Sequence, residues 1–213
     1  MLQFNVLGFP VGIQWFFWLL AVLMGGGLHA DTRDDWIDVA LWVIVLFVSI
    51  LVHELGHALA ARKFGYHSTI VLHGFGGVTI IPHAQFTRGQ SIWVSLSGPL
   101  AGFLLAGVTL ILSMLVDTDY AAVRTMIGMS LFINIVWTLV NLLPILPMDG
   151  GQIFRELLGP GRLKAACLVG GILAAIIAAY AIKWQQIYLA FLFGYFAWIN
   201  FSNGTAEGGV IKG

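Results

Sequence analysis

The sequence predicts an all-α polytopic membrane protein of about six transmembrane helices, with a small membrane-associated β-hairpin between the second and third helices. Of the 213 residues, 59% are hydrophobic and only 9% are charged, and the mean hydropathy is +0.92, which excludes an ordinary soluble domain. Apolar runs of about 20 residues, the length that crosses the hydrocarbon layer, recur along the chain. Between the second and third runs, β-branched stretches flank a glycine-rich turn.

Six apolar segments are long enough to span a bilayer. No Lys or Arg precedes the first one and no small-residue cleavage site follows it, so we expect a retained span rather than a cleaved signal peptide. We expect a single transmembrane domain over residues 1–203 and a flexible tail over 204–213. The predicted spans are 10–29, 36–61, 92–116, 124–147, 163–182 and 185–203.

The basic residues predict the orientation, because Lys and Arg in short loops favour the cytoplasmic side. A cytoplasmic N-terminus places seven of them in inner loops and three in outer loops. We therefore expect a multi-pass protein of the cell membrane with both termini in the cytoplasm. The inner residues are Arg62, Lys63, Arg88, Arg155, Arg162, Lys164 and Lys212, and the outer ones are Arg33, Arg124 and Lys183.

The segment "STIVLHGFGGVTIIP", residues 68–82, predicts the β-hairpin. Lipid does not satisfy the backbone groups of a bare sheet edge. We therefore expect the hairpin to pack against protein, at or just below the cytoplasmic interface. His67, His73 and His83 lie in or beside it without the spacing of metal ligands, which favours interfacial loop positions.

The second span carries the pattern "HELGH", in which His53 and His57 are four residues apart. On a helix they share one face, so both imidazoles can reach one tetrahedral ion. Glu54 follows the first histidine, where it can approach a metal-bound water, as in hydrolases with an H-E-x-x-H motif. Zinc is the ion expected at such a site. The alternative is a hydrogen-bonded polar group inside a helix bundle without a metal.

A third ligand is predicted at the end of the fourth span, in "LVNLLPILPMDGGQI". The second and fourth spans end on the same side, so Asp149 and the two histidines can lie at similar depth. The prolines of this segment break the helix there. Asn141 could hydrogen-bond a substrate backbone or an oxyanion. The alternatives are an Asp149 ion pair with Arg155, and an Asn141 amide bonded to a neighbouring helix.

The remaining composition excludes other classes of protein. The formal net charge is zero and no basic stripe carries interleaved aromatic residues, so we expect no nucleic-acid partner. The only cysteine, Cys167, forms no disulfide within the chain. Among possible partners we expect the lipid bilayer, because the chain is strongly apolar. The sequence predicts no oligomeric state.

The ordered motifs "HELGH", "HGFGGV", "SLSGPLAG" and "NLLPILPMDGG" resemble the site-2 protease family of intramembrane zinc metalloproteases, over roughly residues 45–155. The resemblance implies that His53, His57 and Asp149 bind Zn²⁺ and that Glu54 is the general base. It also implies a transmembrane protein as substrate, cut within its membrane segment in regulated intramembrane proteolysis.

Members of the family are described as holding the unwound substrate as an added strand on a β-element. The resemblance therefore implies a substrate-binding role for part of the hairpin. Those residues are Gly74, Phe75, Gly76, Gly77 and Val78.

The sequence departs from the family pattern in two places. Many members have Asn after "GPLA", where this chain has Gly102. Six spans resemble the branch that commonly carries a CBS domain, but neither a CBS nor a PDZ domain fits in this sequence, so we expect a minimal form. "SGPLAGFLLAG" is also typical of a small-residue face for close helix packing.

Two other functions remain open on the sequence, a polytopic metal-ion transporter and a non-catalytic scaffold stabilised by a metal. A carrier has no use for Glu54 beside a ligand, and paired broken helices in corresponding halves are not evident. Exchange of Glu54 for Gln separates these functions from proteolysis, because zinc should stay bound while cleavage stops.

Overall fold

The computed structural model describes residues 1–116 and 120–205. The chain forms two compact units, one made of Met1–Gln85 and Ser97–Val140, the other of Phe86–Leu96 and the chain from Asn141 onwards. The predicted class is confirmed, since four helices are long and apolar enough to cross a bilayer and the sheet is small. The single domain over 1–203 stays a prediction. The predicted tail lies outside the described residues from 206 onwards.

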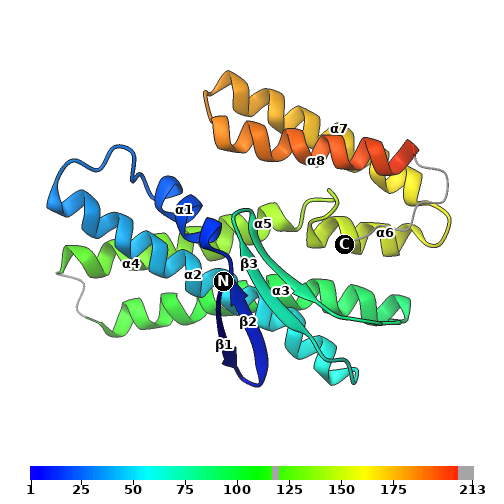
Figure 1. Ribbon diagram of the computed structural model, residues 1–213, viewed down its shortest axis with the longest axis horizontal. Helices are drawn as coiled ribbons and strands as arrows, with labels where there is room; N and C mark the ends of the chain where they lie inside the picture. Colours follow the sequence, from blue (N-terminus) through cyan, green and yellow to red (C-terminus); the bar gives the residue numbers. More distant parts are fainter. Residues whose placement is uncertain (117–119, 206–213) are drawn as a thin grey trace. The chain divides into compact units, whose positions relative to one another are not determined.

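The sheet of the first unit has four strands in the order β1-β2-β3-β4 (Figure 1). β1 (Leu2–Val6) and β2 (Phe9–Ile13) form one antiparallel hairpin, and β3 (Thr69–His73) and β4 (Gly76–Ile80) form another. β2 and β3 pair in parallel. The predicted hairpin is therefore present, and it is half of a larger sheet whose N-terminal half was not predicted.

One face of this sheet forms the core of the first unit. Along β3, Ile70 and Leu72 alternate with more exposed neighbours, and Val11 and Ile13 of β2 pair with them. Each of these four side chains is at most 3% exposed. They pack in one cluster with apolar side chains of the first two helices. Period-two alternation of this kind places one face of each strand against protein, as expected for the hairpin.

The first predicted span, 10–29, is corrected by the structure. Its start is strand β2, and α1 (Trp15–Met24) has only 10 residues. At 1.5 Å per residue α1 is about 15 Å long, half of the roughly 30 Å hydrocarbon layer. The apolar side chains of residues 9–13 are used in the sheet, and three consecutive glycines follow the helix, so hydropathy alone overestimated the length of the span.

The second predicted span is α2 (Arg33–Lys63), a helix of 31 residues. A capping box starts it: Asp35 N–H donates to Thr32 Oγ1 at 3.2 Å, and Thr32 N–H donates to Asp35 Oδ2 at 2.8 Å. Two of the four free N–H groups of the first turn are thereby satisfied. Arg62 and Lys63 lie in its last turn, where positive charge stabilises the helix dipole.

The third and fourth spans are also helical. α3 (Arg88–Leu115) matches the predicted third span. α4 (Ala121–Phe132), the π-helical turn η1 (Ile133–Trp137) and α5 (Thr138–Asn141) form one helix of 21 residues. This helix ends before the predicted boundary of 147. Pro144 cannot donate a backbone hydrogen bond and disfavours helical backbone at the preceding residue, so the chain leaves the helix at Asn141.

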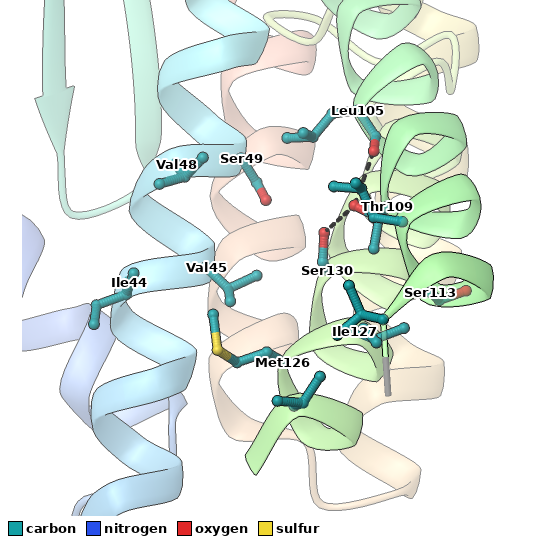
Figure 2. A pocket seen from close by; sticks show the side chains of 13 residues that line it. Ile44, Val45, Val48, Ser49, Leu105, Thr109, Ser113, Met126, Ile127 and Ser130 are labelled. Atoms are coloured by element: carbon teal, nitrogen blue, oxygen red, sulfur yellow. Dashed lines mark hydrogen bonds between the residues drawn. The ribbon is translucent and has the colours of Figure 1, made fainter. Parts of the chain in front are cut away.

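A cavity of about 290 Å³ lies between α2, the second half of α3 and α4 (Figure 2). Its wall is mostly aliphatic, and its polar side chains bond to one another or to backbone. Thr109 Oγ1 and Ser130 Oγ are 2.9 Å apart, and Asn134 Nδ2 donates to Ser49 Oγ at 2.9 Å. Such bonds let hydroxyl and amide groups lie within apolar helices.

The second unit contains α6 (Asp149–Leu158), α7 (Leu163–Lys183) and α8 (Ile187–Thr205). α7 and α8 pack side by side (Figure 1) and correspond to the last two predicted spans, of which α7 is among the four helices that are long and apolar enough to cross a bilayer. The short helix α6 was not predicted. The Arg88 guanidinium donates to the carbonyls of Glu156 and Leu157 and thereby caps the end of α6.

Candidate metal centre

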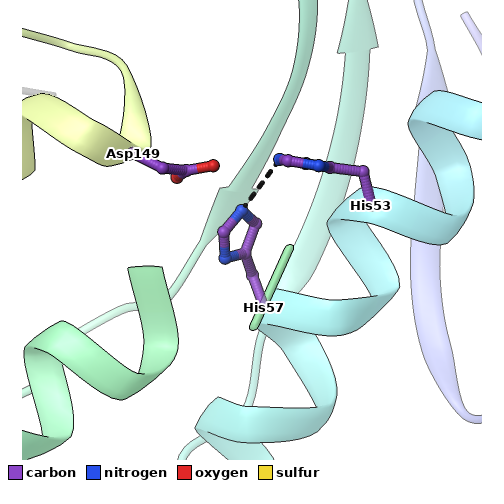
Figure 3. A group of neighbouring side chains, drawn as sticks. All are labelled: His53, His57 and Asp149. Carbon is purple, nitrogen blue, oxygen red and sulfur yellow. Dashed lines mark hydrogen bonds between the residues drawn. The ribbon is translucent and has the colours of Figure 1, made fainter. Parts of the chain in front are cut away.

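The helical geometry of α2 brings His53 and His57 together, as the sequence predicted. Their rings are nearly perpendicular, with centroids 4.9 Å apart, and the two Nε2 atoms are 3.2 Å apart (Figure 3). Two nitrogens on one tetrahedral zinc, each at about 2.0–2.1 Å, are about 3.3–3.4 Å apart. The pair therefore already has the spacing of two zinc ligands.

The space in front of these nitrogens depends on Gly98 of α3. A Cβ at this position would lie 2.2 Å from His57 Nε2 and 2.8 Å from His53 Nε2. Any side chain at Gly98 would therefore occupy the place that an ion needs. Together with two imidazole donors, this gap fits zinc. The pattern "SGPLAGFLLAG" predicted only close helix packing, so the space that Gly98 leaves at the histidines was not predicted.

Close packing of α3 on α2 positions the motif. A Cβ on Gly56 would lie 2.4 Å from the Ser97 carbonyl oxygen and 2.9 Å from the Ala101 Cβ. Gly56 therefore lets the α3 backbone approach the helix between the two histidines. The predicted packing function of the small residues in α3 agrees with this contact.

Glu54 is 5% exposed and faces strand β4. Thr79 Oγ1 donates to Glu54 Oε2 at 2.7 Å and lies 3.1 Å from the Glu54 backbone oxygen. A Cβ on Gly77 would lie 2.5 Å from Glu54 Cγ and 2.6 Å from Oε1. Gly77 and Thr79 share one face of β4, so the strand both accommodates the carboxylate and orients it. Nothing in the sequence pattern had indicated Thr79.

The hairpin residues predicted to bind substrate occupy the turn and the start of β4. Gly76, Gly77 and Val78 are strand residues, and Gly74 and Phe75 form the turn. Among the described strands β4 is at one end of the sheet. Val78 is 41% exposed. The hairpin therefore offers an edge strand next to Glu54.

His73, at the end of β3 and outside the four spanning helices, is a further titratable group near Glu54. Burial lowers the pKa of His73, and the negative charge of Glu54 partly opposes this shift. Phe75 N–H donates to His73 Nδ1 at 3.2 Å, so the neutral ring carries its proton on Nε2. The sequence had suggested an interfacial position without a link to Glu54.

Asp149, also labelled in Figure 3, is the first residue of α6 in the second unit. Asn141 Nδ2 donates to Asp149 Oδ2 at 2.7 Å. A Cβ on Gly150 would lie 2.0 Å from the Leu142 carbonyl oxygen, so only glycine allows this approach. Arg155, the ion-pair partner considered for Asp149, forms a salt bridge with Glu156 at 2.9 Å.

The sequence matches the Peptidase family M50 over residues 41–120 and 114–171, which together cover more than half of the chain. The matched ranges include Glu54, both histidines and Asp149. The chain belongs to peptidase family M50.

Relatives of this M50 chain are named as zinc metalloproteases. A zinc metalloprotease of Methanocaldococcus jannaschii is 32% identical in an alignment of 201 positions that covers 91% of this chain and 58% of the relative. A putative zinc metalloprotease of Synechocystis is 32% identical over 158 residues, covering 70% of this chain and 41% of the relative. The chain thus spans about half the length of these curated relatives.

The fold of this M50 chain is that of a site-2 protease. It is similar to the solved structure of a site-2 protease from Methanocaldococcus jannaschii, with a TM-score of 0.69 and 27% identity, covering 99% of this chain and 98% of that one. Family membership and the four helices long and apolar enough to span identify a membrane protein.

Proposed function

We propose that the chain is an intramembrane zinc metalloendopeptidase that hydrolyses peptide bonds in transmembrane segments of other proteins. The observation that carries the proposal is the environment of Glu54. This buried carboxylate lies between the two histidines in the sequence of α2, and Thr79 holds it against an edge strand. Neither metal transport nor a purely structural function requires an oriented carboxylate at position 54.

In this proposal His53, His57 and Asp149 hold the zinc ion. The facing Nε2 atoms, the gap at Gly98 and the similarity to proteins named as zinc metalloproteases support it. The Asn141 amide fixes the orientation of the Asp149 carboxylate, as outer-shell partners of metal ligands commonly do. Zinc supplies the Lewis-acid activation of water and of the scissile carbonyl.

Glu54 acts as the general base. Its carboxylate removes a proton from the attacking water and then delivers that proton to the leaving amine. The hydrogen bond from Thr79 to Oε2 holds the side chain in one orientation. Burial keeps bulk water away from the carboxylate, so it does not have to shed a full hydration shell before it reacts.

The substrate binds in an extended form along β4. A helical peptide bond is shielded by its own backbone hydrogen bonds, so the segment must unwind before it can be cut. Pairing with the free edge of β4 would satisfy the backbone groups that unwinding exposes. The proposed contact residues are those of the turn and strand from Gly74 to Val78. The predicted contact of Asn141 with substrate stays a prediction.

The proposed location is the cell membrane, with both termini in the cytoplasm. The distribution of Lys and Arg supports this orientation. The parallel pairing of β2 with β3 supports it too, because the N-terminal strands thereby lie on the same side as the C-terminal end of α2. The proposed partners are a transmembrane protein and the lipid bilayer, without nucleic acid.

The test compares Glu54→Gln with the wild-type protein in liposomes that contain a transmembrane test substrate. General-base catalysis contributes about 10²–10⁴-fold, so cleavage should fall by at least a hundredfold while the zinc content stays unchanged. Glu156→Gln, which removes a carboxylate of the second unit, is the matched control and should cleave normally. Cleavage by Glu54→Gln at the wild-type rate would show that the proposed mechanism is wrong.

A crosslinking experiment tests the binding edge separately. In the Glu54→Gln background, Val78→Cys should form a disulfide with a cysteine placed near the scissile bond of the substrate. Leu104→Cys, at a residue of α3 that is 71% exposed, is the control and should not crosslink. Equal crosslinking at both positions would exclude specific binding along β4.

A further inference from the structure

Asn200 of α8 is a fully buried amide in a mostly apolar helix. Its exposed fraction is 0%. Its Nδ2 atom donates to the Phe196 carbonyl one turn earlier at 2.8 Å, and to the Leu146 carbonyl at 2.6 Å. The first bond is local, whereas the second reaches the loop that precedes α6. Asn200 therefore joins the last helix to the segment that ends at Asp149.

Stability alone does not account for this amide. Asn200 Oδ1 is buried and has no hydrogen-bond partner among the residues that the structure describes. A buried amide oxygen without a partner is destabilising. A leucine of similar size would avoid that cost. The amide is therefore better explained by the hydrogen bond from its Nδ2 atom to the Leu146 carbonyl.

α7 leaves room for this contact at Gly170. A Cβ there would lie 2.6 Å from Asn200 Oδ1, 3.0 Å from the Pro144 carbonyl oxygen and 3.2 Å from Ile145 Cα. The loop is therefore enclosed by α7 on one side and held by the Asn200 amide. Ile145 is 0% exposed and Leu146 is 3% exposed, so this part of the loop has little freedom.

The loop in turn fixes the start of α6. Met148 N–H donates to the Ile145 carbonyl at 2.9 Å. A Cβ on Gly151 would lie 2.5 Å from the Ile145 oxygen and from Leu146 N, so the first turn of α6 packs directly on the loop. Any shift of Leu146 is therefore passed to Asp149, three residues later.

We propose that Asn200 is a positioning residue for the metal centre: its bond to the Leu146 carbonyl holds the loop so that the Asp149 carboxylate keeps the place required of a ligand. The proposal rests on the proposed function, in which Asp149 binds zinc. It predicts that loss of the amide weakens zinc binding with little net change in the stability of the fold, because the apolar replacement removes an unpaired buried oxygen while it leaves the Leu146 carbonyl without its donor.

The experiment measures zinc release to an excess of chelator, and thermal unfolding, for the full chain in detergent. Asn200→Leu should release zinc about tenfold faster, at the lower end of the 10–100-fold effect of outer-shell changes, with a nearly unchanged unfolding temperature. Leu192→Ala, at another buried residue of α8, should lower the unfolding temperature while zinc release below that temperature stays normal.

Gly170→Ala tests the same contact from α7, because its Cβ would displace Asn200 and the loop together. Gly194→Ala, where a Cβ meets nothing within 4 Å, is its matched control. Zinc release should be faster in Gly170→Ala and normal in Gly194→Ala. This pair keeps the proposal testable even if Asn200→Leu does not fold.

Asp149→Ala separates the two proposals. If Asp149→Ala loses zinc while Asn200→Leu and Gly170→Ala release it at the wild-type rate, Asn200 has no positioning role. The same conclusion follows if both variants release zinc faster only in proportion to a lowered unfolding temperature. If Asp149→Ala keeps zinc at wild-type affinity, the proposed ligand set itself is wrong.

Discussion

His53 and His57 are held by one continuous helix, whereas Asp149 is held by contacts among several segments far apart in sequence. The histidines have the right spacing because they are four residues apart on α2. Gly98 leaves the space in front of them open, and Gly56 allows α3 to pack against α2. Asp149 begins a short helix after a broken segment. Its position depends on hydrogen bonds from Asn141 to its carboxylate and from Asn200 to the preceding loop.

The difference shows two ways of placing a side chain that is proposed to bind a metal. Local helical geometry needs little support, so a change near the histidines should act by blocking the site. A side chain placed by tertiary contacts depends on each supporting hydrogen bond. A substitution near Asp149 should therefore act by making the position of the Asp149 carboxylate less fixed. The following predictions test this contrast, from the largest expected effect to the smallest.

Gly98→Ala should have the largest effect. Its Cβ would lie 2.2 Å from His57 Nε2, so the ring must turn away and zinc binding should be lost. The fold should be kept, because Ala is favoured over Gly in a helix by about 1 kcal/mol. Zinc content and thermal unfolding measure the two effects. Gly107→Ala, on the same helix where a Cβ meets nothing within 4 Å, should keep zinc. Normal zinc content in Gly98→Ala would contradict the blocking argument.

Asn141→Leu should have a smaller effect on zinc. Loss of an outer-shell hydrogen bond to a ligand typically lowers metal affinity about 10–100-fold, so competition with a chelator should show weaker but measurable binding. The control is Asn134→Leu, which removes a buried amide that bonds Ser49. It should lower thermal stability and leave zinc affinity unchanged. Complete loss of zinc in Asn141→Leu would contradict the expected difference between substitutions near the histidines, which block the site, and substitutions near Asp149, which only weaken binding.

Thr79→Val should slow cleavage without changing zinc binding. The substitution removes the hydroxyl that donates to Glu54 Oε2, and a hydrogen bond to a charged group is typically worth about 1.5–3 kcal/mol. Cleavage of the test substrate should therefore fall by at least about tenfold, since 1.36 kcal/mol corresponds to a factor of ten. Thr109→Val, which changes the same residue type beside the cavity, should cleave at the wild-type rate. Reduced zinc content in Thr79→Val would assign Thr79 to the metal site instead.

The smallest expected effect concerns pH and the hairpin. Burial holds the pKa of His73 below its usual value, so the native hairpin prefers the neutral ring. Its contribution to stability is complete above the unfolded pKa of about 6.5 and is lost as the pH falls toward the native pKa. Hydrogen exchange of β3 and β4 should thus show weaker protection at about pH 5.5 than at about pH 7.5, which are one unit below and one unit above the unfolded pKa. In His73→Gln the difference in protection between the two pH values should disappear. If the difference persisted, another titratable group would be its cause.

The sequence was sufficient for the features that depend on local periodicity. The i, i+4 histidines with Glu54 predicted the motif on α2, and β-branched runs around a glycine turn predicted the β3–β4 hairpin. Pro144 and Pro147 indicated a broken segment before Asp149. These patterns express helix and strand geometry directly, so no tertiary information was needed.

Other features depend on contacts that have no local pattern. The pairing of β2 with β3 joins strands separated by two helices, so hydropathy assigned β2 to a span. Thr79 and Asn200 are important because of what lies opposite them in space. Gly98 is one of several small residues in its helix, and only the histidines facing it distinguish it from the others.

The parallel pairing of β2 with β3 also constrains the order in which the chain can fold. Val11 lies opposite Ile70, so the sheet closes only after α1 and α2 have returned the chain to the side from which it started. Such distant pairing gives a high contact order and forms late. A chain inserted with its N-terminal hairpin on the opposite side of the bilayer leaves β3 without its partner strand. The proposed substrate-binding edge beside Glu54 would then belong to an isolated hairpin that lacks the support of β2.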